Sequence, residues 1–169
     1  INRNNALEKL KGNFEFFQGN ICDYSFILKL FKDFKTQGDF VVLHFAGLKN
    51  ARESFTKSSD YFEINLGGTE ILLKSMLELD LKYLIFASSC SVYGEGSQTF
   101  KVNESTPYRP ISPYGKTKMY AEIAIENASK NSSIKAVSLR FFNVVGNSDF
   151  LSGDKAEFGL LPSLYKSID

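Results

Sequence analysis

Four short apolar segments alternate with longer segments of helical periodicity, and this alternation limits the possible folds more than any other feature of the sequence. The apolar segments are residues 14–18, 40–45, 83–87 and 136–142, and the helical segments between them are residues 24–34, 60–79 and 113–129. Continuous hydrophobicity over a short segment is typical of parallel strands that are buried on both faces. The alternation therefore predicts an α/β fold with a doubly wound parallel sheet.

The composition favours one domain that binds a small molecule. The chain has 169 residues, of which 43% are hydrophobic, enough for one core. Its 20 basic residues are balanced by 19 acidic residues, so no strong field attracts nucleic acid or anionic lipid. The two cysteines, Cys22 and Cys90, match no metal-binding spacing. We therefore expect no metal, no nucleic acid and no membrane among its partners.

Targeting and membrane signals are also missing from the sequence. No apolar segment approaches the ~20 residues that span a bilayer, and the polar N-terminal residues contain no signal-peptide core. Widely separated cysteines without a pairing pattern are usual in a reducing compartment. We expect a cytoplasmic protein.

Tyr114 and Lys118 are the strongest candidates for catalytic residues. They are four residues apart at the start of the predicted helix 113–129, so their side chains share one helical face. Ser112 and Pro113 suit an N-cap and a first helical position, which places Tyr114 in the first turn. A neighbouring ammonium and the positive helix end both favour a phenolate, which can accept a proton. The plain alternative is an exposed Tyr beside an exposed Lys on a solvated helix face.

The predicted fold supports the catalytic reading. Ser89 follows the predicted strand 83–87, Asn143 follows the last predicted strand, and residues 94–113 form a long loop. In a doubly wound sheet, the loops at the carboxyl ends of the strands line the ligand crevice. A Ser89 hydroxyl near Tyr114 would share the proton of the substrate, which completes a Ser/Tyr/Lys site for oxidation at a carbinol carbon.

One common dinucleotide signature is missing from the sequence. A G-x-G-x-x-G loop normally joins the first strand and the first helix of a dinucleotide-binding fold, and no such spacing occurs among the 12 glycines. Either the chain is not a dinucleotide-binding domain, or it lacks the first β-α-β unit of one.

Four ordered motifs resemble those of one family. They are HFAGLK at 44–49, ASSCSVYG at 87–94, SPYGKTK at 112–118 and LRFFNVVG at 139–146. Together they resemble the extended short-chain dehydrogenase/reductases, and most of all the UDP-glucose 4-epimerases among them, from about residue 19 to residue 169. The resemblance implies a Rossmann-like doubly wound sheet that lacks the first β-α-β unit. Residues 1–146 would form a partial NAD-binding domain, and residues 147–169 would begin an incomplete sugar-nucleotide-binding region.

The same resemblance implies a reaction and a set of roles. A hydride passes from C4 of a UDP-hexose to a tightly held NAD, while Tyr114 as a phenolate, assisted by Ser89, removes the C4 hydroxyl proton. Lys118 holds the cofactor ribose and lowers the pKa of Tyr114. The 4-keto sugar turns over and receives the hydride on its other face, so that UDP-glucose and UDP-galactose interconvert.

The family correspondence also implies the residues that bind each molecule. The cofactor-binding residues are Asn20, Ile21, Phe45, Ala46, Gly47, Lys49, Asn65, Ser89, Tyr114, Lys118 and Phe142, and the substrate-binding residues are Ser89, Tyr114 and Asn143. The family usually has Asp-Ile where this chain has Asn20-Ile21, and paired asparagines where it has Phe158-Gly159. UDP-glucuronate and UDP-N-acetylhexosamines stay open as substrates. A homodimer through two helices that include residues 60–79 and 113–129 is also implied.

Further interpretations concern chemistry that the chain could perform or lack. A sugar-nucleotide 4,6-dehydratase needs a carboxylate just after the catalytic Ser or Thr, and Cys90 and Ser91 here cannot replace it at neutral pH. A catalytically silent binding module is the alternative from a different class. We expect the 169 residues alone to show little or no turnover. His44 is interpreted as a core imidazole and Cys90 as a packing residue.

Overall fold

The computed structural model describes residues 14–94 and 101–144. The chain divides into two compact units, Gln18–Phe142 and a second unit that combines the two ends of the chain. All helices and strands of the described residues lie in the first unit. The predicted region 147–169 lies outside the described residues, so the division at residue 146 stays a prediction.

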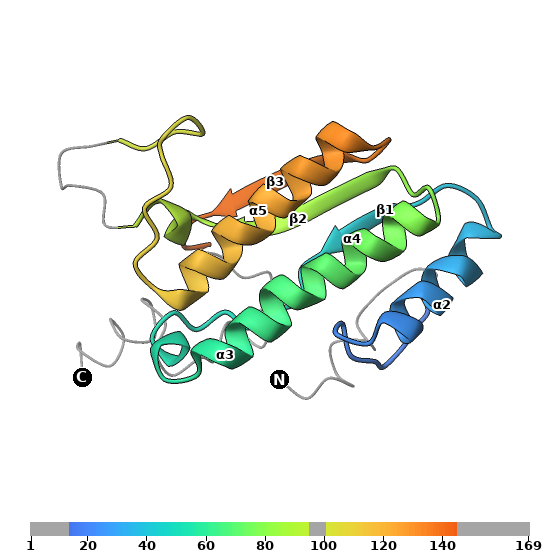
Figure 1. Ribbon diagram of the computed structural model, residues 1–169, viewed down its shortest axis with the longest axis horizontal. Coiled ribbons are helices and arrows are strands. Elements are labelled where there is room, and N and C mark those ends of the chain that lie inside the picture. The colour runs from blue at the N-terminus through green and yellow to red at the C-terminus, as the bar shows by residue number, and fades with distance from the viewer. Residues whose placement is uncertain (1–13, 95–100, 145–169) are drawn as a thin grey trace. The chain divides into compact units, whose positions relative to one another are not determined.

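Three parallel strands form the sheet of the described residues. They are β1 Val41–His44, β2 Tyr83–Ser89 and β3 Lys135–Phe141, in the order β1-β2-β3. The register aligns His44 with Phe86, and Ser89 with Phe141. The carboxyl ends of the strands therefore lie along the same edge of the sheet, where the arrowheads point in Figure 1.

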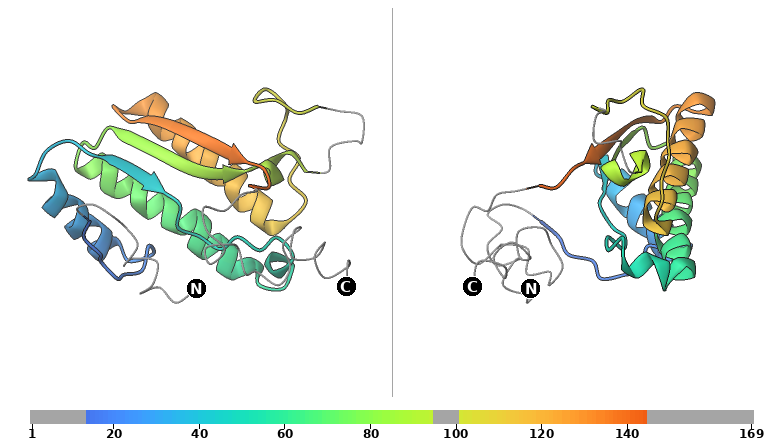
Figure 2. Two further views of the ribbon diagram at one scale, coloured as in Figure 1. Left: turned by 180° about the vertical axis from the view of Figure 1, so that it is seen from behind. Right: turned by 90° about the vertical axis from the view of Figure 1, so that its left-hand side faces the viewer.

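Helices connect the strands, as parallel pairing requires. The longer helices of the described residues are α2 Tyr24–Lys35, α4 Gly68–Glu78 and α5 Pro113–Asn131. The shorter elements are η1 Glu53–Phe55, α3 Ser58–Tyr61, η2 Phe62–Gly67 and η3 Cys90–Tyr93. Helices α4 and α5 cover one face of the sheet, and α2 packs beside α4 (Figure 2).

The core lies between this face of the sheet and the helices. Leu84 and Phe86 of β2 are almost completely buried, as is Met76 of α4. Residues of β2 alternate between buried and more exposed positions because successive side chains of a strand point to opposite faces. Burial of this alternate set fixes the register of the central strand against α4 and α5.

The structure confirms the parallel α/β fold and most of the predicted elements. The helices predicted at 24–34 and 113–129 correspond to α2 and α5, and the strands predicted at 40–45, 83–87 and 136–142 correspond to β1, β2 and β3. The helix predicted at 60–79 corresponds to α3, η2 and α4 in succession. Its middle part, η2, is a π-helical turn instead of a regular α-helical turn.

The predicted strand at residues 14–18 is wrong. These residues have no regular secondary structure and do not join the sheet of the described residues. A strand forms only where a neighbouring strand supplies its hydrogen bonds, and apolar sequence alone does not provide that neighbour. Phe14, Phe16 and Phe17, which were expected to pack in a strand, are exposed.

Among the described residues, no helix combines the length and the apolar character needed to cross a membrane.

Candidate active site

Helix α5 begins in a way that fixes the position of Tyr114. The Ser112 hydroxyl accepts a hydrogen bond from the Gly115 backbone at 3.0 Å, and Pro113 follows as the first helical residue. Gly115 lies so close to η3 that a Cβ there would be 2.6 Å from the Ser91 carbonyl oxygen. This close contact holds the first turn of α5 against the segment that follows β2.

Ser89 ends β2 and faces Tyr114. Its hydroxyl accepts a hydrogen bond from the Ser91 backbone at 3.2 Å, which caps η3, and it donates to the Ser91 hydroxyl at 3.1 Å. Ser89 is close enough to the Tyr114 phenol to lower the pKa of Tyr114. The structure thus brings together two of the three predicted catalytic residues, which come from different elements.

The protein environment nevertheless leaves the Tyr114 phenol protonated at neutral pH. Burial raises the pKa of Tyr114 above its usual value and is the largest cause of the shift. Ser89 and the charge of Lys49 lower the pKa, and Cys90 raises it further. The side chain is half-buried, and the Tyr61 ring packs edge-on against it at 6.3 Å between ring centres.

Lys118 lies one turn further along α5 and is only 6% exposed. Its Nζ atom donates to the Ala87 carbonyl oxygen at 2.8 Å and lies 4.7 Å from the centre of the Phe86 ring. Burial lowers the pKa of Lys118 to about 8, and the charge of Glu122 opposes this shift. Lys118 is therefore mainly an ammonium at neutral pH, with its Nζ atom 6.0 Å from the centre of the Tyr114 ring.

The loop after β1 contains four of the predicted cofactor-binding residues. Phe45, Ala46, Gly47 and Lys49 are all exposed at the carboxyl end of β1. Gly47 has a φ of +152°, a conformation that residues with a Cβ rarely adopt. Asn65 of η2 fixes this loop, because its Oδ1 atom accepts from the Leu48 backbone at 2.7 Å and its Nδ2 atom donates to the Leu48 carbonyl at 3.0 Å.

The other predicted cofactor-binding residues lie on separate elements. Asn20 accepts a hydrogen bond from the Cys22 backbone at 3.0 Å, and Ile21 packs so closely on Gly68 that a Cβ there would be 2.8 Å from Ile21. Phe142 is exposed and stacks on Tyr93, with 6.5 Å between the ring centres. Asn143 belongs to the second compact unit, so its contact with a substrate stays a prediction.

His44 is a neutral core residue, as expected. It is buried, and its Nε2 atom lies 2.9 Å from the Thr69 hydroxyl. Burial and the charge of Lys118 lower the pKa of His44 to about 4. Within the described residues, no group of three or more His, Cys, Asp or Glu side chains could hold a metal ion.

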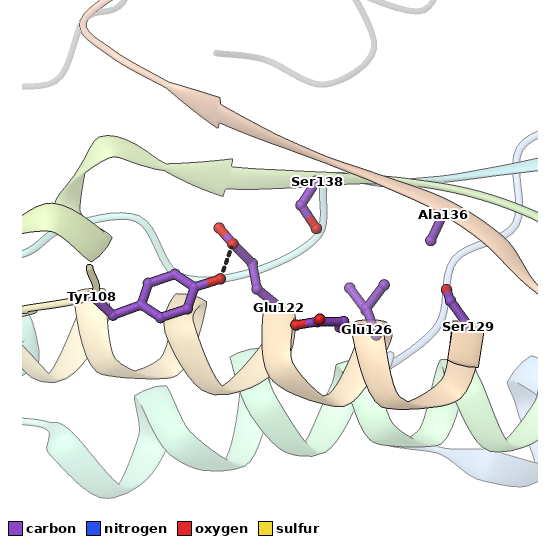
Figure 3. Close-up of a pocket in the computed structure, with 7 residues that line it drawn as sticks. Tyr108, Glu122, Glu126, Ser129, Ala136 and Ser138 are labelled. Carbon is purple, nitrogen blue, oxygen red and sulfur yellow. Dashed lines mark hydrogen bonds between the residues drawn. The ribbon is translucent and has the colours of Figure 1, made fainter. Parts of the chain in front are cut away.

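Sequence reasoning missed an ion pair behind the site. Glu122 of α5 and Arg140 of β3 are 2.8 Å apart between Oε2 and Nη2, with side chains 5% and 16% exposed. Glu122 and Ser138 line two hollows, of about 240 and 330 Å³. Figure 3 shows the smaller hollow, with Tyr108 pointing at Glu122. Neither hollow is lined by the three predicted catalytic residues, so both lie outside the candidate active site.

The spacing along α5 was the signal that could have revealed Glu122. Tyr114, Lys118 and Glu122 are separated by four residues each, and residues at this spacing share one helical face. If this face of α5 is turned toward the site, a carboxylate on it is not a solvent-exposed surface charge and needs a partner inside the protein. No local pattern points to Arg140, because its contact with Glu122 joins residues that are 18 apart in sequence.

Known proteins resemble this chain in sequence and in structure. UDP-glucose 4-epimerase of Lactobacillus helveticus is 38% identical over 156 residues, which cover 90% of this chain and 46% of the relative. The chain spans less than half the length of the curated relatives it matches.

Two solved structures show the same fold. The Thermus thermophilus UDP-glucose 4-epimerase, solved with NAD, superposes with a TM-score of 0.79 and 26% identity over 94% of this chain and 49% of that one. The UDP-Glc/GlcNAc 4-epimerase of Campylobacter jejuni superposes with a TM-score of 0.71 and 30% identity over 83% of this chain and 41% of that one. The sequence model of the NAD dependent epimerase/dehydratase family matches residues 1–169. With the Ser89, Tyr114 and Lys118 arrangement at the edge of a Rossmann-like sheet, this match shows that the chain belongs to the NAD dependent epimerase/dehydratase family.

Proposed function

We propose that the full-length protein is an NAD-dependent 4-epimerase that interconverts UDP-glucose and UDP-galactose through a 4-keto intermediate. The observation that carries this proposal is the convergence of Ser89, at the end of β2, with Tyr114 and the buried Lys118 of α5. Family membership and the 38% identity to a UDP-glucose 4-epimerase support it. Because the chain spans less than half of that relative, the activity is proposed for the whole protein.

The residues at the carboxyl edge of the sheet fit a dinucleotide. The Nζ atom of Lys118 has three donors, of which one reaches the Ala87 carbonyl, so further donors are available for ribose hydroxyls. The loop after β1 exposes backbone at Gly47, where no Cβ blocks a close approach. The residues that would hold NAD are Asn20, Ile21, Phe45, Ala46, Gly47, Lys49, Asn65, Ser89, Tyr114, Lys118 and Phe142. When bound, NAD supplies a hydride acceptor and a positive ring charge.

Tyr114 and Ser89 would handle the proton of the sugar. Tyr114 takes the proton of the C4 hydroxyl and later returns it, while the Ser89 hydroxyl holds the same oxygen by a hydrogen bond. Because burial raises the pKa of Tyr114, the phenolate depends on cations close to the ring. Lys49 and Lys118 are those cations in the protein, and Lys118 acts only while it is an ammonium.

Substrate identity is the least constrained part of this proposal. Asn143 would contact the sugar nucleotide, and the Phe158-Gly159 position lies outside the described residues. The Campylobacter jejuni relative is named for both UDP-Glc and UDP-GlcNAc, which supports UDP-N-acetylhexosamines as a second class of substrate. UDP-glucuronate is the third class that the test includes.

The test is to incubate the purified full-length protein separately with UDP-galactose, UDP-glucuronate and UDP-N-acetylgalactosamine, and to identify each product. UDP-glucose from the first reaction is the expected result. A Tyr114→Phe preparation made in parallel controls for contaminating epimerase. A 4-keto-6-deoxy product would identify a dehydratase, and no product from any of the sugars would indicate a binding module without turnover.

Two further parts of the proposal concern the state of the protein. The 169 residues alone would show little or no turnover, since the phosphate-binding loop and the rest of the substrate region are expected outside them. The full-length protein would be a cytoplasmic homodimer that pairs through α3–α4 and α5. Light scattering of the full-length protein tests the dimer, and cell fractionation tests the location.

A further inference from the structure

The carboxylate of Glu122 accepts hydrogen bonds from three different side chains. Its donors are Ser88 at the end of β2, Tyr108 at 2.8 Å, and the Arg140 guanidinium at 2.8 to 3.1 Å. Figure 3 shows Glu122 extending from α5 with the Tyr108 hydroxyl directed at it. A buried carboxylate that accepts from this many donors is held in one place.

Arg140 in turn has a partner for each of its nitrogen atoms. Nε and Nη2 donate to Glu122, Nη2 also donates to the Tyr108 hydroxyl at 2.8 Å, and Nη1 donates to the Tyr93 hydroxyl and the Glu104 carbonyl at 2.9 and 3.2 Å. The guanidinium also lies 5.0 and 4.8 Å from the centres of the Tyr93 and Tyr108 rings. Arg140 therefore joins β3, η3 and the segment before α5 around Glu122.

Glu122 is connected to the candidate active site in two ways. Its carboxylate holds Ser88, and the next residue, Ser89, is the predicted catalytic serine. It also lies one helical turn beyond Lys118 on the same face of α5, with both side chains buried. Its negative charge favours the ammonium form of Lys118 against the effect of burial.

We propose that Glu122 is a positioning residue for the Ser89, Tyr114 and Lys118 site, which places a carboxylate one helical turn from Lys118 and fixes the end of β2, and that Arg140 holds Glu122 in place. This inference rests on the function proposed above. Burying the Glu122–Arg140 pair costs the desolvation of two charges. Replacing both members of such a pair by well-packed uncharged residues is often neutral for stability, so stability alone does not require the pair. The role that requires the charge of Glu122 is its effect on Lys118.

His44 of β1 and Tyr114 of α5 are further ionisable groups close to Lys118. Tyr61 of α3, Cys90 of η3 and Lys49 of the loop after β1 lie close to Tyr114. His44 is neutral near pH 7 because its pKa is lowered to about 4. Tyr61 stays protonated because its pKa is raised to about 12. Glu122 is thus the anion that opposes the burial of Lys118 near neutral pH.

The test uses the full-length protein and measures two quantities from about pH 6 to about pH 9. One is the affinity for NAD by calorimetry, and the other is kcat with UDP-galactose. In wild type, both should decline as Lys118 loses its proton. Glu122→Gln keeps the shape and a hydrogen-bond acceptor but removes the charge. The decline of NAD affinity and kcat should therefore begin about one pH unit lower than in wild type. At about pH 8 this shift corresponds to about a fivefold loss of NAD affinity. The KM for the sugar should not change.

Two control variants separate charge from stability. Glu126→Gln removes an exposed carboxylate one turn further along α5, where it pairs only with Lys130 among the described ion pairs, and it should leave both profiles unchanged. Glu122→Gln combined with Arg140→Gln removes the guanidinium charge that the single variant would leave without its carboxylate partner. This double variant should recover stability relative to Glu122→Gln alone, while its pH profile should stay shifted.

The outcomes distinguish this inference from the proposed function. If no UDP-sugar turns over, the proposed function fails, and the NAD profiles still test the role of Glu122. Identical pH profiles for Glu122→Gln and wild type would overturn the inference, as would recovery of the wild-type profile in the double variant. Failure of both variants to fold would assign the pair to stability alone and would also overturn it.

Discussion

The carboxamide of Asn65 pairs with both backbone polar groups of Leu48, at 2.7 Å to the nitrogen and 3.0 Å to the carbonyl oxygen. The Asn65 side chain of the π-helical turn η2 thus supplies to the loop after β1 the two hydrogen bonds that a neighbouring strand would otherwise supply. The contact is tight, since a Cβ on Gly47 would lie 2.8 Å from the Asn65 Oδ1 atom. The Nδ2 atom also donates to the Thr117 hydroxyl at 3.3 Å, which connects this loop to α5.

Asn65→Asp should weaken both the fold and NAD binding. A carboxylate can accept from the Leu48 backbone but cannot donate to its carbonyl, and burial of Asn65 disfavours a charge at this position. We expect the full-length protein to lose about 1 to 3 kcal/mol of unfolding free energy and about tenfold in NAD affinity. Urea unfolding and calorimetric titration measure the two effects. Asn127→Asp, at an exposed position of α5, should change neither, and unchanged NAD affinity in Asn65→Asp would show that the loop does not hold the cofactor.

Gly115→Ala should displace the start of α5. The added Cβ would lie 2.6 Å from the Ser91 carbonyl oxygen, so the helix must move away from η3, at a cost of about 1 to 3 kcal/mol. Because Tyr114 precedes this residue, kcat should fall as well. Gly67→Ala is the matched control, since its Cβ would meet only the Phe62 carbonyl at 3.9 Å, and it should stabilise the helix by about 0.5 to 1 kcal/mol. Thermal unfolding that ranks the two variants in the opposite order would contradict this account.

Local signals explain why α5 and its site were predictable from the sequence. Ser112 and Pro113 act on the backbone immediately next to them, and the structure contains the expected cap. The meeting of Ser89 with Tyr114 also followed from the fold, because parallel strands place their carboxyl ends at one edge. The electrostatics of Tyr114 differ from the prediction that Lys118 lowers its pKa. Burial raises the pKa of Tyr114, and the charge of Lys49 lowers it.

The features that the sequence did not reveal all depend on contacts between distant residues. Asn65 and Leu48 are 17 apart in sequence, and Glu122 and Arg140 are 18 apart. No periodicity of 2 or 3.6 residues encodes such pairs. The strand predicted at 14–18 failed for the same reason, because pairing with a neighbour decides whether an apolar segment becomes a strand.

Tyr114→Phe should abolish most turnover without loss of the cofactor. The ring keeps its packing against Tyr61, but it can no longer accept or return a proton, so kcat of the full-length protein should fall by ~10² or more. NAD affinity should change little. Product assays and calorimetry check the two statements. Tyr120→Phe, on an exposed position of the same helix, should retain full activity, and near-normal kcat in Tyr114→Phe would remove Tyr114 as the base.

His44 should make the protein less stable as the pH falls from about 6.5 to about 4. The Thr69 hydroxyl donates to the Asn65 carbonyl at 2.6 Å, so it accepts from the His44 Nε2–H at 2.9 Å. Protonation would add a second N–H at Nδ1, which has no hydrogen-bond partner among the described residues. The folded-state pKa of about 4 therefore lies below the unfolded value, and only the unfolded chain binds this proton between the two values.

The unfolding free energy should consequently rise with pH across this window and be constant, for this group, above it. The full contribution is about 3 kcal/mol, present above about pH 6.5 and lost below about pH 4. Urea unfolding of wild type and of His44→Gln at several pH values isolates it, because carboxylates titrate in both proteins and cancel in the difference. The wild-type protein should lose more stability than the variant on acidification, since only the imidazole must remain uncharged in the core beside Lys118. Parallel pH dependences for the two proteins would show that His44 does not become protonated on unfolding, contrary to its buried position in β1.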